Sequence, residues 1–194
     1  MSAIFVFLLI LLIVTIAVFI KIQHNNVIYV KSNVDDQYYL VRDLGDKQQA
    51  SNMLAKIKQN IIHITEYLMQ NIGKYPDQRK HIEQLSSRIK NVEVLESTED
   101  SVYTSYSVNK GEQIVFCLRS RQIQNKMHKF NLLMYVVLHE MSHVACPEYG
   151  HTPLFKSIFA FITTIAIELY LYTKIGFDQN PEEYCGLMIT DSII

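Results

Sequence analysis

Two histidines flanking a glutamate are the residues best placed to do chemistry, in the run His139-Glu140-Met141-Ser142-His143. On a helix, residues four apart differ by about 40° in direction and about 6 Å in height, so both imidazoles can reach one metal ion. Glu140 is turned by about 100° from His139, which suits contact with a water molecule beside the ion rather than ligation. This spacing predicts a zinc-dependent enzyme that hydrolyses peptide bonds, with Glu140 as the general base.

A catalytic zinc ion usually has three protein ligands and one open position. His151 is the first candidate for the third ligand, because the connection before it contains a proline and a glycine that can turn the chain back. Glu168, on the next apolar segment, and Glu148, inside the turn, are the alternatives. His128 would lie about 16 Å from His139 on a continuous helix, too far to share the ion. Histidine-rich ligation favours zinc among divalent ions.

The motif lies in a segment with helical periodicity, from about His128 to Ala145, which Pro147 ends. A second apolar helix is expected from Pro153 to about Tyr172. This second segment contains Lys156 and Glu168, and a carboxylate at the centre of a bilayer costs about 2.5–3.5 kcal/mol. The pattern therefore favours a buried helix behind the metal site over a second membrane span.

Strands and helices are both expected before the motif, which predicts an α+β fold with a small antiparallel or mixed sheet. Val27–Val30 and Tyr38–Val41 read as a β-hairpin. Asp46 can cap a helix to about Ile72, with Gly73 as its stop, and Pro76 suits the start of another helix to about Lys90. Three further strands are expected: Val92–Leu95, Val102–Val108 and Ile114–Leu118. The last could offer its edge to a substrate, although a purely structural strand fits equally.

The N-terminal segment is apolar from Ala3 to Ile20 except for Thr15. As a helix, its 18 residues would span about 27 Å, close to the thickness of a bilayer core. No Lys or Arg precedes the run and no small-residue cleavage site follows it, which favours an uncleaved anchor over a signal peptide. We expect a transmembrane anchor over residues 1–22 and one domain over residues 23–194. Lys21 and Lys31 follow the span, which places this domain on the cytosolic side.

Charge and cysteine content narrow the function further. The formal net charge is −1 at pH 7, so charge gives no reason to expect nucleic-acid binding. Cys117, Cys146 and Cys185 are widely spaced, which argues against a disulfide scaffold and a four-cysteine zinc site. Reduced thiols are favoured, with one disulfide plus a free thiol as the alternative. Cys146 is expected to be a buried, inert thiol.

The motif and the segment Gly150-His151-Thr152-Pro153-Leu154-Phe155 together resemble the WLM and SprT-like zinc metallopeptidases. The resemblance covers roughly Ile114 to Phe159 and implies a zincin-like domain that acts on a protein or peptide substrate. It implies one catalytic residue, Glu140, and three zinc ligands: His139, His143 and His151. The better-known relatives act on DNA-bound proteins through extensions that are not recognisable here, so that role is not transferred.

The order of an anchor, a helical motif and a terminal Asn180–Gly186 element looks like small membrane proteins encoded by large DNA viruses, which implies a virion or host membrane. A competing hypothesis is an inactive zinc-binding protein with a structural or partner-binding role, although the intact Glu140 argues against it. A hydrolase acting on something other than peptides has no positive sign in the sequence. Four tyrosines are candidates to stabilise an oxyanion, and each could equally be a packing residue: Tyr103, Tyr106, Tyr149 and Tyr184.

Overall fold

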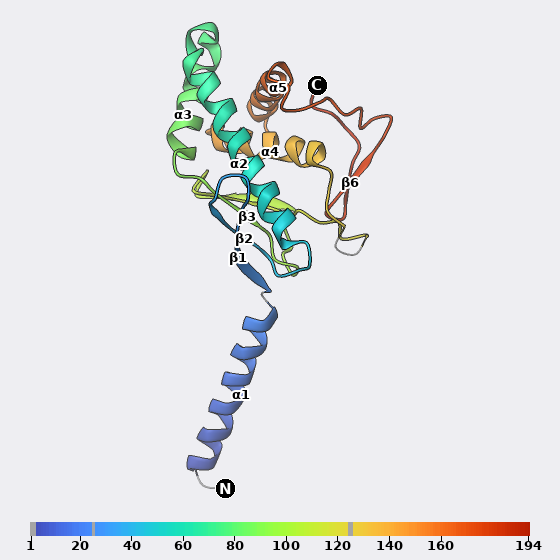
Figure 1. The fold of residues 1–194 in the computed structure, drawn as a ribbon. Coiled ribbons are helices and arrows are strands. Elements are labelled where there is room, and N and C mark those ends of the chain that lie inside the picture. The colour runs from blue at the N-terminus through green and yellow to red at the C-terminus, as the bar shows by residue number, and fades with distance from the viewer. Residues whose placement is uncertain (1–2, 25, 124–125) are drawn as a thin grey trace.

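The computed structural model describes residues 3–24, 26–123 and 126–194, and the side chains of 3, 4 and 17–24 lie outside this description. Helix α1 (Ala3–His24) extends away from a mixed α+β domain that holds the rest of the chain (Figure 1). The observed fold class agrees with the predicted α+β class. Three small sheets and four longer helices after α1 build the described part of the domain.

The predicted N-terminal transmembrane helix finds no support in the described residues. Among them, no helix has both the length and the apolar character required to cross a membrane. The described side chains of α1 are those of Phe5–Ile16, and they are exposed. The predicted anchor, residues 1–22, extends beyond them in both directions and so lies partly outside the described residues.

The first hairpin of the domain is the predicted one. Strands β1 (Val27–Lys31) and β2 (Tyr38–Arg42) pair antiparallel, with Val27 opposite Arg42. Tyr39 and Val41 of β2 are buried beneath helix α2, because alternate residues of a strand face the same side. The hairpin therefore covers one end of the long helix.

The central sheet lies in the order β3-β5-β4 and is mixed, because β3 runs parallel and β4 antiparallel to β5. Its strands are β3 (Glu93–Glu96), β4 (Ser105–Val108) and β5 (Gln113–Phe116). The predicted strand at Ile114–Leu118 corresponds to β5, which is paired on both sides and has no free edge for a substrate. Strands β3 and β4 are the edge strands, and β4 contacts the helix that carries the histidine motif.

Helices pack around the motif helix, α4 (Phe130–Ala145), which contacts α2, α3 and α5 (Figure 1). The other helices are α2 (Lys47–Gln70), α3 (Arg79–Ile89) and α5 (Pro153–Glu168), with 3-10 turns at Ile72–Lys74 and Pro76–Gln78. An apolar stripe of α2 packs in the core. Helix α5 is a buried helix behind the motif, as predicted. Gly73 does not end α2, since it lies inside the following 3-10 turn.

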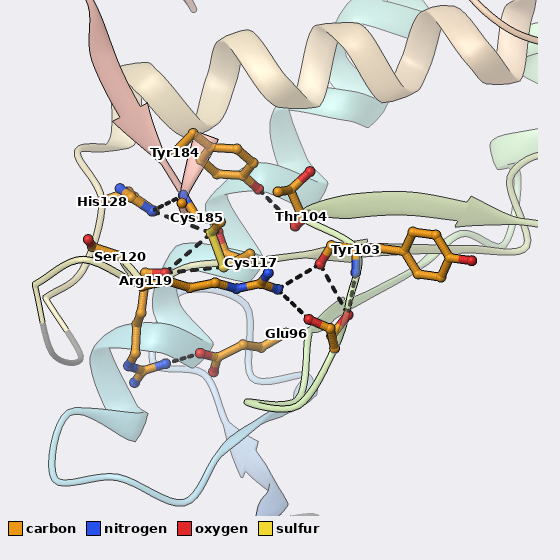
Figure 2. The surroundings of a disulfide bond; sticks show 12 residues. Glu96, Tyr103, Thr104, Cys117, Arg119, Ser120, His128, Tyr184 and Cys185 are labelled. Atoms are coloured by element: carbon orange, nitrogen blue, oxygen red, sulfur yellow. Dashed lines mark hydrogen bonds and ion pairs between the residues drawn. A yellow bond between two sulfur atoms is a disulfide. The ribbon is translucent and has the colours of Figure 1, made fainter. Parts of the chain in front are cut away.

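Asp46 does not cap α2 with its side chain, contrary to the sequence prediction. Its carboxylate instead forms an ion pair with Arg119. The second partner of Arg119 is the buried carboxylate of Glu96, as Figure 2 shows. A buried guanidinium without anionic partners would be costly, so the ion pair takes precedence over the cap. These contacts tie the start of α2 to the end of the sheet.

The C-terminal hairpin was not predicted. Strands β6 (Glu182–Tyr184) and β7 (Leu187–Ile189) pair antiparallel, and a disulfide between Cys117 and Cys185 joins the hairpin to the segment after β5 (Figure 2). The favoured prediction of reduced thiols is therefore wrong, and the alternative of one disulfide and a free thiol holds. Cys146 is free and buried, as expected.

Candidate metal centre

Three histidines from two adjacent elements meet at one point. His139 and His143 lie one turn apart on α4, and His151 lies in the connection, two residues before the start of α5. Their Nε2 atoms are 3.1 Å (His139–His143), 3.2 Å (His143–His151) and 3.1 Å (His139–His151) apart. These three residues form a group that could hold a metal ion. The alternatives for the third position, Glu148 and Glu168, do not join this group among the described residues.

The nitrogen separations fit a tetrahedral zinc ion. Zn–N bonds of about 2.0–2.1 Å at tetrahedral angles separate two ligand nitrogens by about 3.3 Å. Burial and the two neighbouring histidines lower the pKa of His139 to about 3, and burial with His151 and Lys110 lowers the pKa of His143 to about 4. Both imidazoles are therefore neutral near pH 7, which is the form that binds a metal.

Phe155 of α5 fixes the orientation of the imidazoles. Its ring stacks on His143, with centroids 4.2 Å apart, and lies 5.0 Å from the ring of His139 and 4.9 Å from that of His151. Thr152 caps α5 by accepting a hydrogen bond from the backbone N–H of Phe155 at 3.2 Å. The cap therefore sets the position of Phe155 against all three histidines.

Three side chains from outside α4 satisfy the carbonyl groups at its C-terminal end. Gln84 donates to the carbonyls of Val144 and Ala145, and Arg88 donates to that of Val144 at 2.7 Å. Lys110 donates to the next two carbonyls, at 3.3 and 2.9 Å. The two cations also complement the negative end of the helix dipole. These contacts hold the last turn of α4, and with it the connection to the third histidine.

Glu140 is buried on the side of α4 that faces the edge strand β4, with 4% of its surface exposed. Its Oε1 atom accepts a hydrogen bond from Ser105 Oγ at 2.7 Å. Burial raises the pKa of Glu140 to about 7, although the Ser105 hydroxyl opposes the shift. A carboxyl group with a pKa near neutrality can both accept and return a proton. Ser105 could not be predicted from the sequence, since one serine in a predicted strand carries no signal of its partner.

The four candidate tyrosines lie in different surroundings. Tyr184 is buried near Ser105, and its hydroxyl donates to the carbonyl of Thr104 at 3.4 Å (Figure 2). Burial raises the pKa of the Tyr184 hydroxyl, and the charge of Glu140 adds to this shift. Tyr103 and Tyr149 are largely exposed, and Tyr103 packs against Tyr106. Of the four, Tyr184 is the one that lines a pocket with His139 and His151.

His128 lies apart from the three histidines, as the spacing along the chain predicted. Its Nε2 atom accepts a hydrogen bond from the backbone N–H of Cys185 at 3.3 Å, so it contacts the disulfide and the C-terminal hairpin (Figure 2). Burial lowers its pKa. We assign His128 to the support of the hairpin rather than to the metal centre.

The fold and the histidine cluster define an α+β domain with a candidate metal centre on one helix and the loop that follows it. No family model matches the chain. The chain is 44% identical over 166 residues to the "Uncharacterized protein R325" of Acanthamoeba polyphaga mimivirus, a match that covers 86% of this chain and 84% of that protein. The chain therefore belongs to the same family as R325.

Two relatives in other viruses match shorter stretches. The "Uncharacterized protein 136R" of Invertebrate iridescent virus 6 is 38% identical over 71 residues, 36% of this chain and 39% of that protein. The "Uncharacterized protein 042R" of Invertebrate iridescent virus 3 is 34% identical over 99 residues, 50% of this chain and 55% of that protein. All three relatives are viral proteins, which agrees with the viral layout suggested by the sequence.

Among solved structures, the fold is similar to the crystal structure of a Wss1 mutant from Saccharomyces cerevisiae. The TM-score is 0.48 at 18% sequence identity, and the match covers 68% of this chain and 91% of that chain.

Proposed function

We propose that this protein is a zinc-dependent metallopeptidase of the WLM and SprT-like kind, with His139, His143 and His151 as the zinc ligands. The observation that carries the proposal is the convergence of the three Nε2 atoms at 3.1–3.2 Å beside the buried Glu140. Imidazoles whose ring nitrogens converge on one point are suited to a cation, and three nitrogen donors with an open fourth position are typical of catalytic zinc.

Glu140 is the general acid/base of the proposed reaction. A zinc ion held by His139, His143 and His151 would supply a Lewis acid for the scissile carbonyl and a lowered pKa for the attacking water. Glu140 accepts a proton from that water and returns it to the leaving amine. Ser105 holds one carboxylate oxygen of Glu140 through its 2.7 Å hydrogen bond, so the other oxygen remains for the water. The low exposure of Glu140 limits access of bulk water to the proton in transit.

Strand β4 is positioned to receive the substrate backbone. It is an edge strand of the central sheet, and such an edge presents backbone N–H and C=O groups to which an extended peptide can add. Its first residue, Ser105, contacts Glu140 directly. A peptide paired with β4 would therefore pass beside the general base.

Zinc content and peptide hydrolysis together test the proposal, on the full-length protein. We expect about one zinc ion per wild-type chain, with cleavage of a denatured protein substrate. Glu140→Gln should keep the zinc and lose at least about 100-fold in rate, because the base is removed while the ligands stay. His151→Ala should lose both zinc and activity, and His63→Ala, which alters an exposed histidine, should lose neither.

Two outcomes would contradict the proposal in different ways. A folded wild-type protein that binds no zinc would remove the metal centre. A protein that binds zinc but cleaves no substrate, with Glu140→Gln indistinguishable from wild type, would instead leave a structural or partner-binding zinc protein.

A further inference from the structure

A pocket of about 320 Å³ opens directly beside the candidate metal centre. His139 and His151 form one side of it, together with Ser105, the partner of Glu140. Tyr135 and Val136 of α4 form the base, and the C-terminal hairpin contributes the remaining wall. The pocket therefore lies between the proposed zinc ligands and the C-terminal hairpin, which was not predicted from the sequence.

Apart from the histidines, the lining of the pocket is uncharged and mainly apolar. Tyr184, Leu187 and Ile189 line the side formed by the hairpin, and no described residue that lines the pocket is an aspartate, glutamate, lysine or arginine. Its volume lies at the lower end of the range of about 300–1,000 Å³ typical of small-molecule sites. The pocket therefore has room for one large side chain but not for a folded surface.

We propose that this pocket binds an apolar side chain, such as leucine or phenylalanine, of the residue next to the scissile peptide bond. The inference rests on the proposed peptidase function and adds a substrate class to it. A peptide that pairs with β4 passes Ser105, and a side chain directed toward α4 from that path enters the pocket beside His139. An acidic or basic side chain would leave its charge without a partner there, which disfavours its binding.

The disulfide and its neighbours hold the hairpin wall in place. Cys185 follows Tyr184 directly, and its bond to Cys117 anchors the hairpin to the segment after β5 (Figure 2). The backbone N–H of Cys185 donates to His128 at 3.3 Å, and the Tyr184 hydroxyl donates to Thr104. The wall is thus fixed to the same sheet that carries the general-base partner Ser105.

Two neighbouring residues of β7 provide a matched pair of variants. Leu187 is 60% exposed and lines the pocket, whereas Met188 is 53% exposed and does not line it. Successive residues of a strand point to opposite faces, so Leu187→Lys places a charge at the pocket and Met188→Lys places the same charge on the far side. Both side chains are exposed, so neither change buries a lysine in the core.

The experiment measures kcat/KM of full-length zinc-loaded protein on a peptide series that varies one position beside the cleaved bond. We expect wild type to prefer leucine or phenylalanine over aspartate by at least about 10-fold. Leu187→Lys should reduce cleavage of the apolar peptides several-fold and improve that of the aspartate peptide, while Met188→Lys should resemble wild type. In parallel, the affinity of the Glu140→Gln protein for the same peptides measures binding without cleavage.

The outcomes separate this inference from the proposed function. Cleavage with no apolar preference, or equal effects of Leu187→Lys and Met188→Lys, would overturn the pocket assignment and leave the peptidase intact. If no peptide is cleaved, but Glu140→Gln and wild type bind apolar peptides with a dependence on Leu187, the pocket assignment stands and the peptidase proposal fails. If the protein neither cleaves the peptides nor binds them selectively, both the pocket assignment and the peptidase proposal are refuted.

Discussion

Two polar clusters lie within the domain, and they are built on different principles. In the first, which we call the arginine cluster, the buried Arg119 is paired with Glu96 and Asp46. Figure 2 shows the Arg119–Glu96 pair beside the Cys117–Cys185 disulfide. In the second, the histidine cluster, three imidazoles present their Nε2 atoms to one another at 3.1–3.2 Å. The first cluster pairs its cation with carboxylates of its own, and the second consists of metal-donor nitrogens alone.

The difference indicates which cluster is structural and which is functional. A paired guanidinium and a disulfide restrain the fold without a ligand. Removal of one ion of the buried pair is destabilising, because it leaves the other charge buried and unpaired. Three imidazole nitrogens gain little from one another and gain much from a cation. Stability should therefore depend on the arginine cluster in all conditions, and on the histidine cluster only when metal is present.

The largest expected effect comes from breaking the arginine cluster. Arg119→Met leaves Glu96 buried without its cation and should lower the free energy of unfolding by about 3–5 kcal/mol. Denaturant titration measures this value. The double variant Arg119→Met/Glu96→Gln should recover part of the loss, since no buried charge remains unpaired. Glu99→Ala removes the exposed partner of Arg42 and should cost at most about 1 kcal/mol.

The disulfide should contribute the next largest effect. Its cysteines are 68 residues apart, and closing a long loop restricts the unfolded chain, so reduction should cost about 2–4 kcal/mol. Thermal unfolding with and without a dithiol reductant measures the difference. The variant Cys117→Ala/Cys185→Ala should no longer respond to the reductant. An unchanged wild-type midpoint after complete reduction would contradict the restraint assigned to this bond.

Zinc should stabilise the folded protein, and it should do so only through the histidine cluster. At a free zinc concentration about 100 times Kd, binding to the folded state adds about 2.7 kcal/mol to the free energy of unfolding. We expect this gain in wild type and in His63→Ala, and its loss in His143→Ala, by thermal unfolding in the presence and absence of a chelator. A gain retained in His143→Ala would place the zinc outside the histidine cluster.

The smallest effect concerns His128 and pH. Burial lowers the pKa of this histidine in the folded protein, so the unfolded chain binds its proton more readily once the pH falls below about 6.5. Stability should therefore decrease as the pH falls through this value toward the lowered pKa of the folded state. His128→Gln should reduce the slope of unfolding free energy against pH in this window. An unchanged slope would show that the histidine does not contribute.

Most secondary structure could be predicted because its signals are local. The stripe of α2, the ends of α4 and the pairing of β1 with β2 follow from apolar spacing within a few turns or strand residues. The side-chain cap expected from Asp46 failed because Arg119, 73 residues away, competes for the same carboxylate. The hairpin β6–β7 escaped prediction because its strands are three residues each and carry no clear alternation.

The sequence by itself determined the pair of histidines on α4 and the intervening glutamate, because the period of a helix fixes which residues share a face. It also limited the candidates for the third metal ligand to three residues. The tertiary structure alone brought His151 to the pair, placed Ser105 against Glu140 across 35 residues, and joined Cys117 to Cys185 across 68. Such contacts depend on how distant elements pack together, which no local pattern encodes.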